Sequence, residues 1–388
     1  MTRDFVIGAR VLLSQIGLAT MILAQSSWLL AGSSVRAATP ARLAIYYGYP
    51  SLVNGANGDV QKAVSVFSAY DVVVWGDGIE FPDKESRRYP AGDPEEHQRA
   101  ARILAAVRER SPGTRFYGYV CLGDIALPNG ETISLTPKQL EERVLLWKQM
   151  GVAGIFLDEA GYDFPVVTRK RQNLAVGIIH ELGLSAFVNA YFLDDLFSLE
   201  DKLPSANGIA NNPEHLPPLL DKRDIFLLES FQVKNGSYEG VSEWQPRLNK
   251  ALKYRRRYGT RIFATTTTTE QELFNGEKFN YAWWTALLYG LDGFSWGEPN
   301  FAAQSNALPD HRCNLESTAV LHAFERPTAV GFDGTHFWRK AGNYLVVGDS
   351  STHLVHRFPS DGQVQAKDAE TLLTSSRGAS LLACGGGA

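Results

Sequence analysis

Short apolar runs alternate with amphipathic stretches along most of the chain. Between residues 42 and 297, eight runs have the length and the content of β-branched and aromatic residues expected of buried strands. They cover residues 42–49, 71–77, 115–123, 154–158, 185–190, 224–230, 261–267 and 293–297. Eight strand–helix units in about 250 residues predict an α/β fold, a (β/α)8 TIM barrel.

Start and stop signals for helices support this prediction. Thr136, followed by a proline and by Gln139, is typical of a helix start, and that helix is expected to stop at Gly151. A doubly wound open sheet is the alternative, but no glycine-rich dinucleotide turn follows the first predicted strand. The same kind of start is expected at Asp93, and further helices are expected at 168–182, 243–258 and 279–289, each followed by a glycine.

The chain changes character before residue 38. Arg3 and Arg10 precede an apolar run interrupted by polar residues, and Val35-Arg36-Ala37 is typical of a signal-peptidase site. We therefore expect residues 1–37 to be a signal peptide of a secreted, periplasmic or cell-surface protein. An uncleaved membrane anchor is the alternative, which the polar interruptions disfavour.

The chain changes again after residue 300. Strand-like runs at 335–339, 344–348 and 353–358, with a hairpin turn at Ala341-Gly342-Asn343, predict a small β-rich appendage. A short helix is expected at 315–324. The expected organisation is a signal peptide (1–37), a glycoside-hydrolase-like barrel (38–300) and a C-terminal appendage with its tail (301–388).

Composition narrows the possible functions only slightly. The chain has 388 residues, of which 44% are hydrophobic and 21% charged, with a net charge of −4. No nucleic-acid partner is indicated, and the sequence does not indicate an oligomeric state. Three cysteines show neither a disulfide framework nor zinc-ligand spacing. Cys121 is expected in the core, and a bridge between Cys313 and Cys384 would suit an oxidising compartment.

Carboxylates and aromatic residues gather at the carboxyl ends of the predicted strands, where the active sites of such barrels lie. The apolar run 155–157 ends in Asp158 and Glu159, and the run 225–228 ends in the same way in Glu229. Acids in such places are costly unless they are paired or used. The other candidates, for substrate binding, are Tyr46, Tyr47, Asp77, Tyr119, Asp124, Asn189, Tyr191, Trp296 and Glu298.

This set of residues is typical of a sugar site. Glycoside cleavage needs one carboxylic acid to protonate the leaving oxygen and a carboxylate opposite it, while aromatic faces stack on sugar rings. Asp158 and Glu229 come from the fourth and sixth strands, so they are expected to face each other across the scissile bond. The structural alternative for each acid is a helix cap or an ion pair, and for each aromatic residue it is packing. No histidine falls at a predicted strand end, and no phosphate-binding glycine loop is present, so no metal or cofactor is expected.

Four stretches resemble a known family. The segments AIYYGYP (44–50), YGYV (117–120), GIFLDE (154–159) and LLES (227–230) are similar to the spherulin-4-like glycoside hydrolases. They are also similar to the related endo-α-1,4-galactosaminidases and to the hydrolase domain of the Pel polysaccharide system. The resemblance covers residues 42–298, and the chain departs from the family after that point and in an insertion at 203–223.

The resemblance implies a secreted (β/α)8 endo-glycosidase that acts with retention on partly deacetylated α-1,4-linked N-acetylgalactosamine polymers of a biofilm or cell wall. It implies Asp158 as the nucleophile and Glu229 as the acid/base, with Glu159 supporting them. The residues by themselves leave the two roles interchangeable.

Two other functions fit parts of the pattern. A non-catalytic carbohydrate-binding barrel of a surface layer or extracellular matrix would keep the aromatic residues and pair its acids with Arg or Lys, and neither residue type lies at the predicted strand ends. A lyase or isomerase barrel usually requires a metal or a Schiff-base lysine, which the sequence does not offer there. The sequence therefore predicts a glycosidase, with the identity of its polysaccharide left open.

Overall fold

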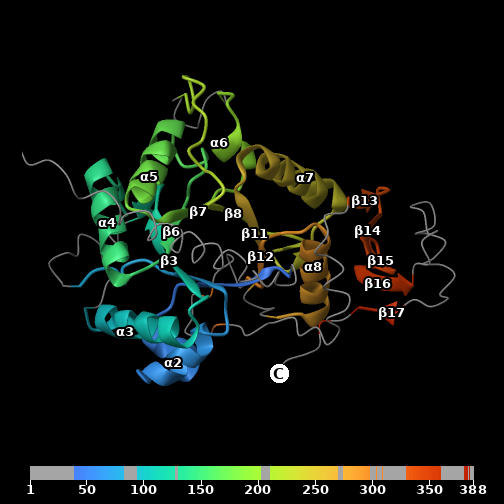
Figure 1. The fold of residues 1–388 in the computed structure, drawn as a ribbon. Coiled ribbons are helices and arrows are strands. Elements are labelled where there is room, and N and C mark those ends of the chain that lie inside the picture. The colour runs from blue at the N-terminus through green and yellow to red at the C-terminus, as the bar shows by residue number, and fades with distance from the viewer. Residues whose placement is uncertain are drawn as a thin grey trace, which may run out of the picture.

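The computed structural model describes residues 39–82, 94–126, 130–201, 210–269, 274–297, 303, 308, 329–359, 380–382 and 384. Parallel strands in this part of the chain close into an eight-stranded barrel in the order β1-β12-β11-β8-β7-β6-β3-β2 (Figure 1). The predicted (β/α)8 TIM barrel is confirmed, and each predicted run overlaps one barrel strand. These are β1 (Ala41–Tyr46), β2 (Val72–Trp75), β3 (Arg115–Cys121), β6 (Gly154–Asp158), β7 (Ser185–Asn189), β8 (Ile225–Leu228), β11 (Arg261–Thr265) and β12 (Gly293–Ser295).

Helices surround the barrel and begin and end largely where the capping signals predict. Thr136 and Gln139 form a capping box at the start of α4, which ends at Gly151 in the left-handed conformation. Thr168 caps α5, and Gly259 ends α7. The expected cap at Asp93 lies outside the described residues. The helices are η1 (Pro50–Gly55), α2 (Val60–Phe67), α3 (Pro94–Arg110), α4 (Pro137–Met150), α5 (Arg169–Glu181), α6 (Leu193–Phe197), α7 (Val241–Tyr258) and α8 (Gly276–Leu288).

The alternation of side chains along each strand separates two apolar layers. One layer lies between the strands and the helices. The other layer fills the interior of the barrel. Because residues two positions apart on a strand face the same side, the side chain that follows each interior residue by two positions also points inward, at the carboxyl end of the barrel. The interior layer consists of Leu43, Ile45, Val72, Val74, Tyr117, Phe156, Phe187, Ile225, Leu227 and Phe263.

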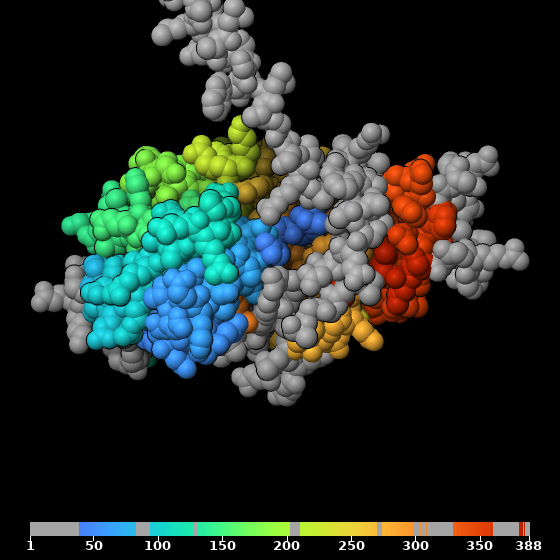
Figure 2. All heavy atoms as spheres, turned by 60° about the horizontal axis from the view of Figure 1, so that its bottom comes forward, coloured from blue at the N-terminus to red at the C-terminus, as the bar shows by residue number. Residues whose placement is uncertain are grey.

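A small antiparallel sheet follows the barrel, as predicted. Figure 1 shows α8 between the barrel and this sheet, and Figure 2 shows the sheet as a red lobe at one edge of the molecule. Phe337 packs against Trp244 and Tyr289 at ring distances of 5.7 and 5.8 Å, which joins the sheet to the apolar layer outside the barrel. The strands are β13 (Gly331–Phe332), β14 (His336–Ala341), β15 (Tyr344–Asp349), β16 (Leu354–Pro359) and β17 (Ser380–Leu381).

Three predictions concern segments at or near the ends of the chain. The expected signal peptide, the helix at 315–324 and Cys313 lie outside the described residues. Cys384 is disulfide-bonded, and Cys121 is free and buried, as expected of a core residue. In the part of the chain that the structure describes, every helix is too short or too polar to cross a membrane.

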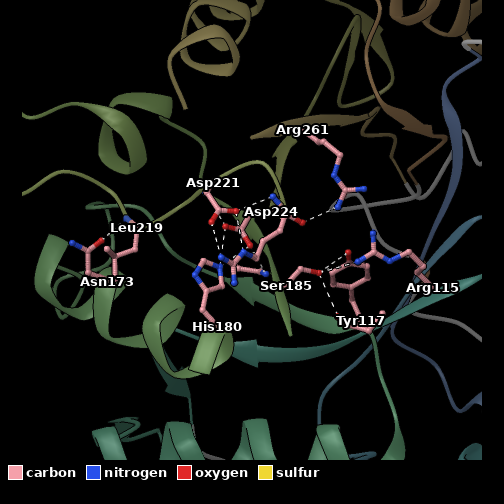
Figure 3. Close-up of polar contacts among 12 residues, drawn as sticks. Arg115, Tyr117, Asn173, His180, Ser185, Leu219, Asp221, Asp224 and Arg261 are labelled. Carbon is pink, nitrogen blue, oxygen red and sulfur yellow. Dashed lines mark hydrogen bonds and ion pairs between the residues drawn. The ribbon is translucent and has the colours of Figure 1, made fainter. Parts of the chain in front are cut away.

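Polar side chains close the amino end of the barrel (Figure 3). Arg115 Nη2 donates to Ser185 Oγ at 3.1 Å, and the hydroxyl group of Tyr117 lies 3.0 Å from the same oxygen. Next to them, the fully buried carboxylate of Asp224 lies 3.0 Å from His180 Nε2. Hydrogen bonds between side chains therefore hold this end, while the opposite end carries the predicted carboxylates.

Candidate active site

A polar ring lies above the apolar interior at the carboxyl end of the barrel. Asp158 follows Phe156 by two positions on β6, and Glu229 follows Leu227 in the same way just after β8. The alternation of side chains therefore directs both carboxylates inward. Each strand contributes one residue to this ring, either within its last residues or just after its end, in the order Tyr47, Gly76, Tyr119, Asp158, Asn189, Glu229, Thr265 and Ser295.

Asn189 connects the two carboxylates. It ends β7, which lies between β6 and β8 in the barrel. Its Nδ2 atom donates to Asp158 Oδ1 at 2.9 Å and lies 3.4 Å from Glu229 Oε2. The sequence prediction that these three residues lie together at one end of the barrel agrees with this arrangement.

Asp158 is surrounded by neutral hydrogen-bond donors. Besides Asn189, its carboxylate accepts from the main-chain nitrogen of Glu159 at 3.0 Å, and the neighbouring Tyr47 and Tyr119 side chains also favour its anion. The two tyrosine rings meet edge to face at 5.3 Å. Burial raises the pKa of Asp158, and the donors oppose this by stabilising the anion.

Glu229 has a different environment. The pKa of its carboxyl is raised from 4.5 to about 7, mainly by burial and to a lesser extent by the charges of Asp158 and Asp163. The amide of Asn189 and the charge of Arg247 act in the opposite direction. Glu229 is therefore close to half protonated at neutral pH, which is the condition that suits an acid/base group.

The backbone turns sharply after each of the two carboxylates. Glu159 and Ser230, the residues that follow them, both adopt the left-handed conformation with a φ of 54°. Such conformations are costly for residues other than glycine and are often retained at functional sites. The turn directs Glu159 toward β3, where its Oε2 accepts from the thiol of Cys121 at 3.2 Å.

Tyr46 and Trp296 lie apart from this group. Tyr46 is fully buried on the opposite face of β1, with its ring 5.6 Å from that of Phe67. Trp296 is also buried, and its ring lies 5.4 Å from that of Phe274. Both side chains therefore belong to the apolar layer outside the barrel. For Tyr46 the reason is the alternation of side chains along β1, because the next residue, Tyr47, faces inward.

The predicted acids on the neighbouring loops have protein partners. Asp77 pairs with the buried guanidinium of Arg143, which also binds Glu80. Asp124 accepts from Ser134 Oγ at 2.6 Å within the hairpin of β4 (Asp124–Ala126) and β5 (Thr132–Ser134). These contacts hold the loops around the ring. The predicted Glu298 lies outside the described residues.

Tyr191 lies between two cations on the other side of the ring. Its hydroxyl group accepts from Lys234 Nζ at 2.7 Å, and the guanidinium of Arg247 lies 5.4 Å from the centre of its ring. Lys234 belongs to a short hairpin of β9 (Val233–Lys234) and β10 (Ser237–Tyr238) that follows Glu229. Neither this hairpin nor the role of Arg247 is visible in the sequence pattern, because two-residue strands show no periodicity and Arg247 is in a helix.

A group of residues with the spacing of metal ligands lies at the opposite end of the barrel. The ligand atoms of His180, Asp221 and Asp224 lie within 4.8 Å of one another, and Figure 3 shows these side chains converging. The carboxylate of Asp224 accepts from the main-chain nitrogens of Ala186 at 2.8 Å and Asp221 at 2.9 Å as well as contacting His180. These bonds account for the group as part of the structural network at that end.

Comparison with known proteins identifies no family. No protein-family profile and no curated protein matches the sequence. Among solved structures, an endo-beta-1,4-glucanase from Xanthomonas axonopodis pv. citri is 11% identical with a TM-score of 0.38, covering 67% of this chain and 87% of its own. A pyruvate carboxylase from Rhizobium etli is 11% identical with a TM-score of 0.39, covering 67% and 23%. A morphinone reductase is 8% identical with a TM-score of 0.34, covering 66% and 82%. At these identities and scores, the likenesses do not indicate what the chain binds or catalyses.

Proposed function

We propose that the protein is a secreted glycoside hydrolase that cleaves an amino-sugar polysaccharide of the α-1,4-linked galactosamine or N-acetylgalactosamine type. The observation that carries the reaction type is the pair formed by the buried carboxylate of Asp158 and the partly buried carboxylate of Glu229, both held by the single amide of Asn189. The substrate class rests on the resemblance of the strand-end segments to the spherulin-4-like hydrolases.

The environment of the pair supports catalysis over binding alone. Among the described residues, no Lys, Arg or His nitrogen forms an ion pair with the side chain of Asp158 or Glu229 within 4.0 Å. Neutral donors hold Asp158, so its negative charge remains available to a developing positive charge. A carboxylate that served only the fold would be expected to have a cationic partner.

The spacing of the two acids favours retention. Asp158 Oδ1 lies 2.9 Å and Glu229 Oε2 lies 3.4 Å from Asn189 Nδ2. The two oxygens therefore cannot lie farther apart than the sum of these two distances. That limit is below the roughly 6.5 Å at which the separations of inverting pairs begin. The limit applies to this pair of oxygens, and it supports a retaining reaction through a covalent intermediate over an inverting one.

The surroundings of the two acids support the roles that the resemblance implies. The donors around Asp158 oppose the rise of its pKa by burial and suit a nucleophile, while a carboxyl with a pKa of about 7 suits the acid/base role of Glu229. As an Asp158 oxygen bonds to the anomeric carbon, the glycosidic C–O bond breaks and the proton of Glu229 passes to the leaving oxygen. Water then attacks the anomeric carbon, gives a proton to Glu229 and displaces Asp158 as a carboxylate.

A panel of glycans tests the proposal. The full chain is incubated with partly deacetylated α-1,4-linked N-acetylgalactosamine polymer, chitosan, chitin and cellulose, and new reducing ends are measured. We expect cleavage of the first polymer only, with the product released first as the α-anomer in proton NMR. Protein carrying Asp158→Asn, purified in parallel, controls for contaminating hydrolases. If no glycan is cleaved but one binds equally well to both proteins, the molecule is a carbohydrate-binding barrel instead.

The pH dependence of the reaction is expected to report Glu229. Because Glu229 must carry a proton to assist the leaving group, kcat/KM should fall as the pH rises through about 7, the pKa of this carboxyl in the free enzyme. An aryl glycoside with a good leaving group should lose much of this dependence, since its departure needs no proton. If kcat/KM for the polymer instead falls only above about pH 9, the proton that assists the leaving group comes from a different group.

A further inference from the structure

Glu229 lies at the point where the chain leaves the barrel. Strand β8 ends at Leu228, and both Ser230 and Gln232 have a positive φ, at 54° and 66°. The main-chain carbonyls of this turn need partners outside the sheet ladder. Arg247, on α7, supplies one: its Nη2 atom donates to the carbonyl oxygen of Glu229 at 3.2 Å and to that of Ser230 at 3.1 Å.

Arg247 is itself held from two sides. Nη2 also donates to the buried carboxylate of Glu239 at 3.0 Å, and the guanidinium lies over the ring of Tyr191. Only 18% of the Arg247 side chain is exposed. The three acceptors share the two N–H groups of one nitrogen, whose position is fixed by the rigid guanidinium, whereas the ammonium of a lysine lies on a flexible stem and is not held in that position.

We propose that Arg247 is a positioning residue for Glu229, which fixes the turn after β8 so that the carboxyl stays at Asn189 opposite Asp158. Its effect on turnover rests on the proposed hydrolase function. Its effect on the carboxyl of Glu229 does not, because the contacts exist without a substrate.

The charge of Arg247 gives this role a second consequence. The groups that act on the Glu229 carboxyl are Asp158 from β6, Asn189 from β7, Asp163 from the loop after β6, and Arg247 from α7. The two acids raise the pKa of Glu229, and Arg247 is the cation that lowers it. Removal of this charge should therefore move the titration of Glu229 to higher pH.

Three variants separate charge from geometry. Arg247→Gln removes both the charge and the paired donors, and Arg247→Lys keeps the charge alone. Arg255→Gln is the matched control, because Arg255 is on the same helix and its Nη1 atom also binds a main-chain carbonyl, that of Gly290 at 2.6 Å, but at the amino end of the barrel. Carbon-13 NMR of labelled glutamate carboxyls follows the titration, and Glu229→Gln identifies the resonance.

We expect the midpoint of Glu229 to rise by about one pH unit in Arg247→Gln. In the same variant, kcat on the cleaved glycan should fall roughly 100-fold, with KM little changed, because the misplaced acid affects the transition state more than binding. Arg247→Lys should keep the midpoint and still lose roughly tenfold in kcat. Arg255→Gln should match the wild type in both measurements.

The proposal is overturned if Arg247→Gln keeps the wild-type midpoint, or if its kcat falls no further than that of Arg255→Gln. If Arg247→Gln does not fold, Arg247→Lys decides, and an undiminished kcat in that variant overturns the proposal. If the wild type cleaves no glycan, the proposed hydrolase function fails, and the NMR titration still decides whether Arg247 sets the state of Glu229.

Discussion

Asp158→Asn and Glu229→Gln should each lower kcat/KM on the polymer by roughly 10⁴-fold while leaving the fold intact. Asparagine is nearly isosteric with aspartate and keeps an oxygen that can accept from Asn189, but it cannot form the glycosyl ester. Glutamine likewise retains the shape of Glu229 and cannot give a proton to the leaving oxygen. Unchanged melting temperatures and circular dichroism would establish that the loss is chemical.

The two variants differ in how they can be rescued, which tests the assignment of roles. An aryl glycoside with an activated leaving group should restore the first step of Glu229→Gln, and added azide should then give a glycosyl azide of retained configuration. Asp158→Asn should not regain a retaining reaction with either addition. If Asp158→Asn instead is rescued by the aryl glycoside and gives a glycosyl azide of retained configuration, Asp158 is the acid/base and Glu229 is the nucleophile. Glu95→Gln, a change at an exposed residue of α3, serves as the control.

The parts of the site that could be predicted from sequence depend on local patterns. A strand buried on both faces is a run of apolar residues, and an acid at its end is visible without knowledge of the fold. This signal identified Asp158 and Glu229, and the eightfold repeat predicted the barrel. The alternation of side chains along β1 also distinguishes Tyr47, which faces the barrel interior, from Tyr46, which faces the surrounding helices. The sequence contains this distinction, although the sequence prediction assigns both residues to substrate binding.

The remaining features depend on long side chains that reach across the fold. The predicted strand ends contain no Arg or Lys, yet Arg143 reaches Asp77 from α4, and Arg247 reaches the turn after Glu229 from α7. Helix periodicity reveals which face of a helix packs inward, but it does not reveal which carboxylate an arginine on that face will meet. Asp77 was therefore predicted as a substrate ligand, while the structure gives it an arginine partner.

Arg143→Met is expected to lower the free energy of unfolding by about 3–5 kcal/mol, measured by chemical denaturation at pH 8. Arg143 is 2% exposed, and its Nε atom donates at 2.7 Å to Glu80, which is fully buried. Removal of the cation leaves the carboxylate of Glu80 in the apolar layer with neither solvent nor a charged partner. In contrast, Lys138→Met on the same helix should change stability by less than about 1 kcal/mol, because the ion pair of Lys138 with Glu142 is exposed to solvent.

The loss in Arg143→Met should depend on pH in a defined direction. Burial raises the pKa of Glu80 to about 7 even with Arg143 present, and the loss of the cation raises it further. The folded variant then binds a proton that the unfolded chain releases, so its stability increases as the pH falls from 8 toward 5. A second change, Glu80→Leu, should recover part of the stability at pH 8 by removing the unpaired acid. If the free energy of unfolding of Arg143→Met stays below that of the wild type by a constant amount across this pH range, and the double variant recovers nothing, Arg143 stabilises the fold by packing alone.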